Sequence, residues 1–450
     1  MDPPPLARPS AAIVPLLVLL AGIALLHGVG AFGLSRGVDL PGSPGNAFFD
    51  IDTGRVIADW TTWAQSDRAR THPLYKFIAL VGIPLNDVLF RGGNPTGAVR
   101  LIGIAAMLGQ VAMVVAMMGR LGACRTRQAL AGAALGVSAC GFFLSAIPDT
   151  AVVAGLFSVA PFLLLYARRG EAVTWGESAA WVALALGAFG VTISQIVFVL
   201  VALSFRVWWL RGDARAAHAL RMAVGIVVVA AGTAYLLMKL QGAVFGGTTR
   251  LYKLDDTIRK EYKFMETEQL AREPHARAGR LLLNAAVHNF AAPPPALEEW
   301  SPPRSPRRFL SLTFVDAPPL AWRGWQWPML LSHLALLAIV LARWRPRAEL
   351  APVYIALAGQ ALLHLVYGRE FLMYAPHWHG LLIVALLAAP GAIPRWLVAW
   401  AWLQIAAMAA SNLAMLHESF RTYREDFPAT RAVELIRAGD LAVGAAAADN

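Results

Sequence analysis

The chain has 450 residues, of which 57% are hydrophobic and only 15% are charged, and its mean hydropathy is +0.54. Soluble domains typically carry about 25% charged residues, so this composition excludes an ordinary soluble protein and favours an all-α polytopic membrane protein. The net charge is +11, but the arginines are spread over short connections between apolar segments. Because cytoplasmic loops prefer Lys and Arg, we interpret these basic residues as markers of the cytoplasmic loops and expect no nucleic-acid partner.

The apolar segments predict about eleven membrane-spanning helices. We expect them at 11–34, 98–119, 128–147, 150–167, as two short helices within 178–209, and at 220–240, 328–342, 350–367, 374–389 and 396–416. The first segment is kept as a helix because it is long enough to span and no convincing signal-peptide cleavage site follows it. Arg8 precedes this segment, so we expect it to start in the cytoplasm and to end outside.

Residues 35–97 then form the first external loop, and we expect interfacial helices within it. One is predicted at 55–64, with Trp60 and Trp63 at the depth of the lipid headgroups, where indole rings prefer to lie. Another is predicted at 73–90, an apolar stretch that is too interrupted to span cleanly. Together these segments give the loop a scaffold at the membrane surface.

The remaining boundaries follow from composition. Residues 1–240 form an N-terminal transmembrane module, 241–327 a small external cap, 328–417 the C-terminal helices and 418–450 an external tail. Within 178–209, the polar residues Thr192 and Gln195 indicate a break between two helices. A break at membrane depth is tolerated where protein or a water-filled cavity covers the backbone, so this pair is a candidate cavity wall.

Two carboxylates in the first external loop are the leading candidates for chemistry. Asp50 and Asp52 follow the first span, and in an extended segment residues two apart share a face. One carboxylate within reach of an acceptor hydroxyl would act as a general base. The pair would also suit oxygen coordination of Mg²⁺ or Mn²⁺, so metal dependence stays open. The alternative interpretation is a solvated loop whose acids face water.

Other unusual polar residues fall on the same, external side. Asp149 follows Pro148 and would either cap the next helix or belong to the site, and His72 before Pro73 is equally ambiguous. A later run supplies basic and aromatic groups that suit a phosphate at the lipid surface. It contains Arg369, Glu370, Tyr374 and His377.

Several other kinds of site are not expected. Cys124 and Cys140 should differ in depth, so we predict no disulfide between them. No phosphate-binding P-loop is present, which disfavours transport driven by ATP.

At this point the pattern resembles the GT-C superfamily of integral membrane glycosyltransferases, which use polyprenyl-phosphate-linked sugars. Four short elements carry the resemblance, in the order FFDIDTGRVIADW, THPLY, PDT and GREFLMYAPHW. The likeness covers the N-terminal two-fifths of the chain and, more loosely, its C-terminal third. It implies a GT-C-like fold in the cytoplasmic (inner) membrane of a bacterium, with the active site on the external face.

The resemblance also implies roles for individual residues. The catalytic base would be Asp50, with Asp52 close behind it, in an inverting transfer to a glycan, lipid or protein acceptor. The leaving lipid phosphate would be stabilised by basic residues of the external segments. The residues expected to bind substrate are His72, Asp149, Gln195, Arg250, Lys253, Arg369, Glu370, Tyr374 and His377.

Two other classes of function stay open. A transporter or flippase of a lipid-linked glycan would use similar broken helices, but it would need polar residues through the centre of the membrane. A non-catalytic membrane assembly subunit would not need its external acids. The identities of the sugar and of the acceptor do not follow from the sequence.

Overall fold

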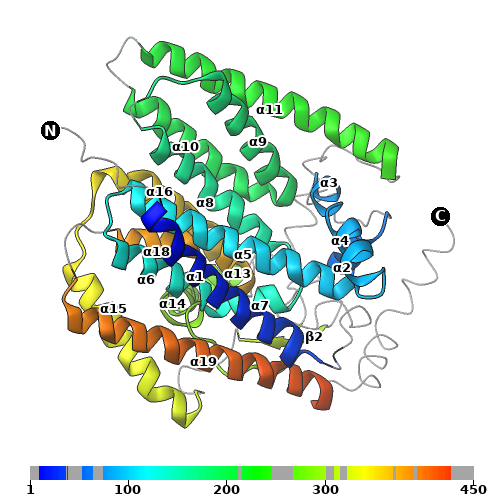
Figure 1. Ribbon diagram of the computed structural model, residues 1–450, viewed down its shortest axis with the longest axis vertical. Helices are drawn as coiled ribbons and strands as arrows, with labels where there is room; N and C mark the ends of the chain where they lie inside the picture. Colours follow the sequence, from blue (N-terminus) through cyan, green and yellow to red (C-terminus); the bar gives the residue numbers. More distant parts are fainter. Residues whose placement is uncertain are drawn as a thin grey trace.

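The computed structural model describes residues 10–36, 38, 53–63, 74–169, 171–210, 215–245, 267–300, 309–314, 322–367, 371–388 and 393–426. The described part is a bundle of helices with one short two-stranded sheet (Figure 1). The helices of the N-terminal half are α1 Ser10–Gly28 with its extension Val29–Leu34, α2 Thr53–Thr61, α3 Tyr75–Ala79, α4 Gly82–Phe90, α5 Pro95–Arg120, α6 Arg125–Gly136, α7 Ala139–Ala146, α8 Ala151–Ala167, α9 Trp175–Val191, η3 Ile193–Gln195, α10 Ile196–Trp209 and α11 Arg215–Phe245.

The C-terminal half contains shorter elements between long helices. They are α13 Thr267–Arg272, α14 Pro274–Leu283, η4 Asn284–His288, β1 Ala296–Trp300, β2 Phe309–Thr313, η5 Gly324–Gln326, α15 Trp327–Arg343, η6 Ala348–Leu350, α16 Ala351–Val366, α17 Phe371–Tyr374, η7 Ala375–His377, α18 His379–Leu387 and α19 Arg395–Asp426. The strands are antiparallel, with Ala296 opposite Thr313 and Trp300 opposite Phe309.

Six of the helices in the described part are long and apolar enough to cross a membrane, or seven if the bent pair α6–α7 counts as one span. The prediction of about eleven spans is therefore not confirmed. Every predicted apolar segment does form helix, but α8, α9 and η3–α10 are shorter than the spanning length. These three helical segments pack against one another and against α5 and α11. Their apolar composition therefore reflects packing against protein as well as contact with lipid.

The outer helices present the surface expected of a membrane protein. Large apolar side chains are exposed along α11, where Leu220, Val224 and Val228 are each more than half exposed. An apolar surface of this extent marks contact with another apolar phase, and on a bundle with six or seven helices of spanning length that phase is lipid.

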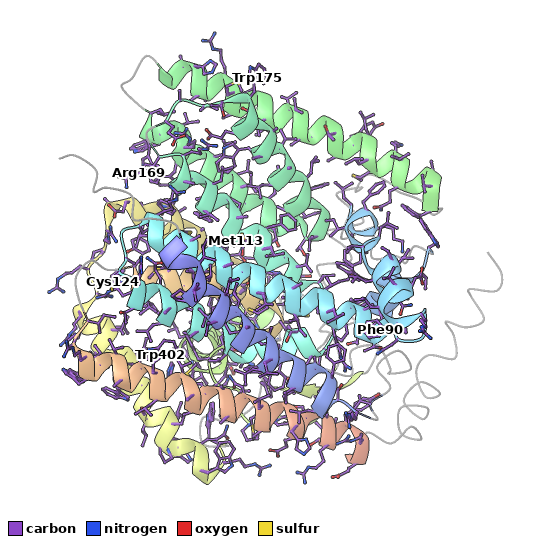
Figure 2. The ribbon with its side chains drawn as sticks, in the orientation of Figure 1. Phe90, Met113, Cys124, Arg169, Trp175 and Trp402 are labelled. Atoms are coloured by element: carbon purple, nitrogen blue, oxygen red, sulfur yellow. The ribbon has the colours of Figure 1, made fainter. Side chains whose placement is uncertain are left out.

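The bundle has two distinct ends, and α5 runs between them. We call one the basic end, because Arg127, Arg169 and Arg347 lie there. The Arg347 guanidinium donates to the carbonyls of Leu121 and Ala388, which joins the end of α5 to the end of α18. Figure 2 labels Cys124 and Arg169 at this end and Phe90 at the opposite end. Arginine-rich ends are expected on the cytoplasmic side.

The opposite end, which we call the site end, is built by the first-loop helices. Trp63 stacks against Phe245 at the end of α11, with ring centroids 6.1 Å apart. Helix α3 packs against the end of α9, where a methyl group on Gly190 would come 2.8 Å from the Cβ of Leu74. Helices α2 and α4 also pack on α5. The predicted loop scaffold is thus present, but it is folded onto the bundle.

This packing bears on one prediction. The Trp60 side chain is not available to lipid headgroups, because it is only 1% exposed and makes an edge-on contact with Tyr75. The α2 backbone approaches α4 so closely that a methyl group on Gly82 would overlap the carbonyl oxygen of Trp60. Trp63, at 66% exposure, is the tryptophan that remains at the surface. Tertiary packing of a short amphipathic helix has overridden the interfacial preference of the indole.

Two further boundaries differ from the predictions. Part of the expected cap belongs to the helical core, since Phe290 and Ala292 are buried and the Asn412 side chain donates to Phe290 O and accepts from Ala292 N. Residues 246–266, 301–308 and 315–321 of that cap, which include Arg250 and Lys253, lie outside the described residues. At the other boundary, α19 continues to Asp426, past the predicted span end, because Phe420 is fully buried.

Candidate functional site

The site end gathers the candidate residues that the structure describes. The turn between α7 and α8 holds Asp149, the break between α9 and α10 holds Gln195, and η7 ends at His377. Both η3 and η7 pack against α8, and η7 also packs against α7. Helix α8 is therefore the common neighbour of η3 and η7, and the turn that holds Asp149 leads into it.

Helix lengths place the turn that holds Asp149 below the outermost rim of the bundle. Both α5 and α8 reach the basic end, where Leu121 accepts from Arg347 and Tyr166 donates to Glu349 O at 2.8 Å. At about 1.5 Å per residue, α5 is about 39 Å long and α8 about 25 Å long. The start of α8 therefore lies about 10 Å or more short of the start of α5, at an inner level of the site end.

Asp149 fits the first of its two predicted roles. Its carboxylate accepts the backbone N–H of Ala151 at 3.2 Å, so it satisfies a free donor in the first turn of α8. An acid at this position also complements the positive end of the helix dipole. The side chain is only 8% exposed. A structural role for the carboxylate is thus established by its geometry, and a role in binding substrate stays a prediction.

The late aromatic and basic element is a layered cluster. The Tyr374 ring lies 4.9 Å from His364 and 6.0 Å from both Tyr367 and His377, measured between ring centroids. His377 is 4% exposed. The cluster therefore lies within the protein and not in a loose loop, which agrees with a built site better than with an interfacial anchor belt.

Arg277 fixes this cluster to the rest of the bundle, and the sequence analysis missed it. Its guanidinium donates to the carbonyls of His364 and Leu365 at the end of α16, both at 3.0 Å. It also lies over the Phe371 ring at 5.0 Å. A cation at a helix C-terminus satisfies carbonyls that lack partners within the helix. Nothing in the local sequence of α14 indicates this distant contact.

The break predicted within 178–209 is confirmed, and it places Gln195 at the tip of a helical hairpin. Helix α9 ends at Val191, Thr192 is extended, and η3 leads into α10. Gln195 is fully buried, and among the described residues its side-chain amide has no hydrogen-bond partner. A buried amide without a partner is costly, so the tip is suited to a polar ligand or to ordered water.

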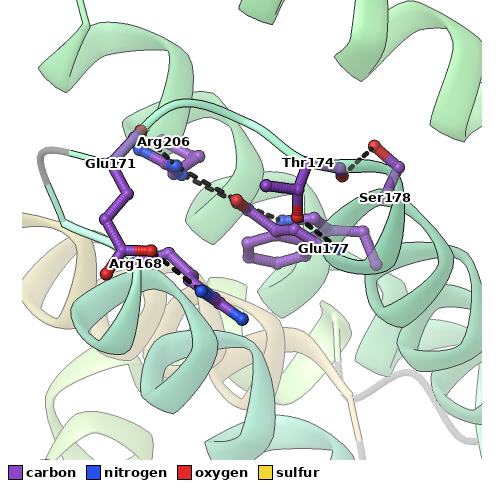
Figure 3. Close-up of polar contacts among 7 residues, drawn as sticks. Arg168, Glu171, Thr174, Glu177, Ser178 and Arg206 are labelled. Carbon is purple, nitrogen blue, oxygen red and sulfur yellow. Dashed lines mark hydrogen bonds and ion pairs between the residues drawn. The ribbon is translucent and has the colours of Figure 1, made fainter.

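The other end of the same hairpin is locked by a buried ion pair (Figure 3). Arg206 Nε lies 2.8 Å from the carboxylate of Glu177, and the two side chains are at most 1% exposed. Glu177 also accepts from the Trp181 indole at 3.1 Å, and Arg206 donates to Glu171 O at 2.7 Å. On the surface, the hydrogen bond from Arg168 lowers the pKa of Glu171 below its ordinary value. The hairpin is thus rigid at the basic end.

Lys76 plays a similar part at the site end. Its ammonium donates to Asp59 O at 2.6 Å and to Thr62 O, so α3 caps the end of α2. Burial lowers the pKa of Lys76, and the nearby Asp59 carboxylate partly offsets this. Helix α2 begins directly after Asp52. The lysine therefore orients the helix that follows the two predicted catalytic acids.

Seven of the candidate residues lie outside the described part of the chain. They are Asp50, Asp52, His72, Arg250, Lys253, Arg369 and Glu370. Among the residues that are described, no group of three or more His, Cys, Asp or Glu side chains gathers as metal ligands do. The two cysteines are free, as predicted, with Cys124 exposed and Cys140 buried.

Comparison with known proteins gives one distant structural match. No protein-family model matches the chain, and no curated protein matches it. Among solved structures, it is similar to the archaeal oligosaccharyltransferase AglB from Archaeoglobus fulgidus, in complex with an inhibitory peptide and a dolichol-phosphate. The TM-score is 0.42 and the identity 11%, over 90% of this chain and 55% of that one. At this level of similarity we transfer no residue and no activity from that enzyme to this chain.

Proposed function

We propose that this protein is a membrane glycosyltransferase that moves a sugar from a polyprenyl-phosphate donor to an acceptor outside the cytoplasmic membrane. The observation that carries the proposal is that the elements holding Gln195 and His377 both pack against α8, the helix that Asp149 caps. The order of sequence elements that resembles GT-C enzymes supports the same function. Polar side chains within an apolar membrane bundle usually belong to functional sites.

The chemistry follows from the residue types. The acceptor hydroxyl oxygen attacks the anomeric carbon of the donor sugar while the bond from that carbon to the phosphate oxygen breaks. The Asp50 carboxylate takes the hydroxyl proton, with Asp52 as the alternative base. The lipid phosphate leaves as an anion, so no general acid is needed. The leaving charge would be stabilised by Arg369 and His377, and by Arg250 or Lys253.

The remaining candidates have supporting roles in this proposal. His72 and Glu370 would contact the donor near the first loop and the late element, and Tyr374 would pack against it. If the enzyme uses Mg²⁺ or Mn²⁺, Asp50 and Asp52 would supply ligand oxygens. The inverted product configuration follows from a single displacement, which needs no covalent intermediate on the protein.

A direct test compares three variants in purified form. Asp50→Asn and Asp52→Asn remove the charge and keep the shape, whereas Asp87→Asn does the same at an exposed position on α4 of the same loop. We expect Asp50→Asn or Asp52→Asn to lose transfer by about 100-fold or more, with unchanged thermal melting. Asp87→Asn should transfer sugar as the wild type does. Full activity in both of the first two variants would exclude the proposed base.

One observation favours a second candidate, a transporter or flippase of a lipid-linked glycan. Within the described part of the chain, His288, Asn289 and His379 are buried and their side-chain nitrogen and oxygen atoms have no hydrogen-bond partner. Polar groups of this kind inside a bundle also occur along transport paths. Liposomes distinguish the two candidates, because a flippase moves labelled lipid-linked glycan across the bilayer without any acceptor and without transferring sugar.

A further inference from the structure

One buried cation at the site end has no counter-charge in the part of the chain that the structure describes. Arg100 lies on α5, about one and a half turns from its start, and its side chain is 7% exposed. Its Nε donates to Ala146 O, the last residue of α7, at 2.8 Å. Its Nη2 has no hydrogen-bond partner, and no carboxylate of the described residues lies within ion-pair distance.

The crossing of α5 and α7 explains how the arginine reaches this place. Gly103 sits at the crossing, where a Cβ atom would be 3.3 Å from the Cα of Ser145. This close approach brings Arg100, one turn earlier on α5, alongside the end of α7. The turn that holds Asp149 begins just beyond Ala146. The guanidinium thus lies close to the turn that precedes α8.

The contact with α7 does not account for a guanidinium at this depth. The end of a helix carries only about half a negative charge, and one carbonyl uses one of the five N–H donors of arginine. A guanidinium stays protonated in proteins, so it cannot escape the cost of burial by becoming neutral. Buried charges that lack a partner are expensive and usually belong to functional sites.

We infer that Arg100 binds the phosphate of the lipid-linked donor and holds it beside the start of α8. This inference rests on the proposed function and adds a residue that the sequence elements do not contain. The guanidinium fork suits a phosphate group. By length, Arg100 lies about 8 Å inward from the start of α5, so a phosphate carried by a lipid would reach it along the bundle.

Arg120 gives a matched control, because it is on the same helix and is exposed at the basic end. The variants are Arg100→Met, Arg100→Lys and Arg120→Met, purified as full-length protein. The probes are geranylgeranyl monophosphate, the uncharged alcohol geranylgeraniol, and inorganic phosphate alone. The readouts are the binding constant of each probe and the melting temperature with and without it.

We expect wild type and Arg120→Met to bind the lipid phosphate at least tenfold more tightly than the alcohol and to melt at higher temperature with it. Arg100→Met should lose at least tenfold in affinity for the lipid phosphate and should lose the melting shift. Without ligand it should melt no lower than wild type, because an uncompensated charge has been replaced by an apolar chain of similar length. A residue that only capped α7 would instead melt lower and leave binding unchanged.

The outcomes separate the inference from the function. If Arg100→Met does not fold, Arg100→Lys carries the test, because a lysine keeps the charge but loses the fork and should weaken binding. If Arg100→Met folds and binds the lipid phosphate as tightly as wild type does, the inference is overturned. If only Arg100→Lys folds, equal binding by that variant and wild type overturns it. Neither result contradicts the proposed donor. A wild-type protein that binds the alcohol as tightly as the phosphate overturns both. If inorganic phosphate binds as tightly as the lipid phosphate, the inference that the bound phosphate belongs to a lipid is overturned.

Discussion

Single cations in contact with backbone carbonyls organise both ends of this protein. The buried Arg277 holds the late aromatic element, the buried Lys76 holds α2, and the half-buried Arg347 joins the ends of α5 and α18. Each donates to carbonyl groups at or near the end of a helix, where the backbone lacks partners. In a bundle with few charged residues, each such contact fixes the position of a whole element. The residues that carry the proposed chemistry are therefore oriented by side chains that do not take part in it.

Lys76 allows the first prediction. Lys76→Met removes two hydrogen bonds from a charged donor and should lower the free energy of unfolding by about 2 kcal/mol or more. It should also reduce sugar transfer, because α2 begins directly after Asp52. Chemical denaturation in detergent measures the stability. Lys239→Met, at an exposed position on α11, is the control and should change neither quantity.

The same lysine gives a pH dependence with a defined sign. Burial lowers the pKa of Lys76 in the folded protein. At a pH between this lowered pKa and the ordinary pKa of lysine, the Lys76 amine is therefore more fully protonated in the unfolded chain than in the folded protein. The stability of the wild type relative to Lys76→Met should therefore rise as the pH increases toward about 10. A difference that falls over the same range would contradict the burial of this ammonium.

At the scale of elements, the hairpin of α9 and α10 is closed at one end and broken at the other. The Glu177–Arg206 pair closes it at the basic end, and Thr192 interrupts it at the site end. Because the closed end is held by a buried ion pair, movement of the hairpin would be confined to its tip. That tip carries Gln195, whose amide is available to a ligand.

A double-mutant cycle tests this lock. Glu177→Gln and Arg206→Met should each cost about 3–5 kcal/mol, because each leaves a buried charge without its partner. The double variant should cost clearly less than the sum of the two. The exposed pair Arg168–Glu171 is the reference, and its removal should give little measurable change. Additive losses in the buried pair would mean that the two side chains do not interact as described.

Sequence reasoning found these elements to different degrees. Apolar runs and their basic flanks predicted the helix positions and the break near Thr192, because length and charge are local properties. The burial of Trp60 and the insertion of Phe290 into the core depend on contacts between distant segments, which no local pattern contains. The sequence shows Arg100 as a lone cation in an apolar run, AVRLIGI. That its Nη2 is buried without a partner follows only from the crossing of α5 and α7.

At the scale of the whole molecule, the two ends differ in kind. The basic end is closed by backbone contacts of arginines, whereas the site end contains buried polar groups around a shorter helix. From the positive-inside preference we expect the basic end in the cytoplasm and the site end outside. In the proposed function, this orientation would determine the side from which donor and acceptor arrive.

Thiol labelling tests the orientation. Cys124 is exposed at the basic end and Cys140 is buried, so a membrane-impermeant maleimide should label wild-type protein in inside-out vesicles but not in intact cells. Cys124→Ser should abolish the signal. On that background, Asp87→Cys on α4 should be labelled in intact cells. Labelling of Cys124 from outside would reverse the topology and remove the proposed external site.

The most direct measurement is a cryo-electron-microscopy map of the purified protein with a bound polyprenyl phosphate. We predict density for the phosphate beside Arg100, between that side chain and the element that ends at His377, with the lipid tail running along the bundle. Phosphate density at the basic end, or no phosphate density beside Arg100 in the presence of saturating lipid, would contradict the prediction.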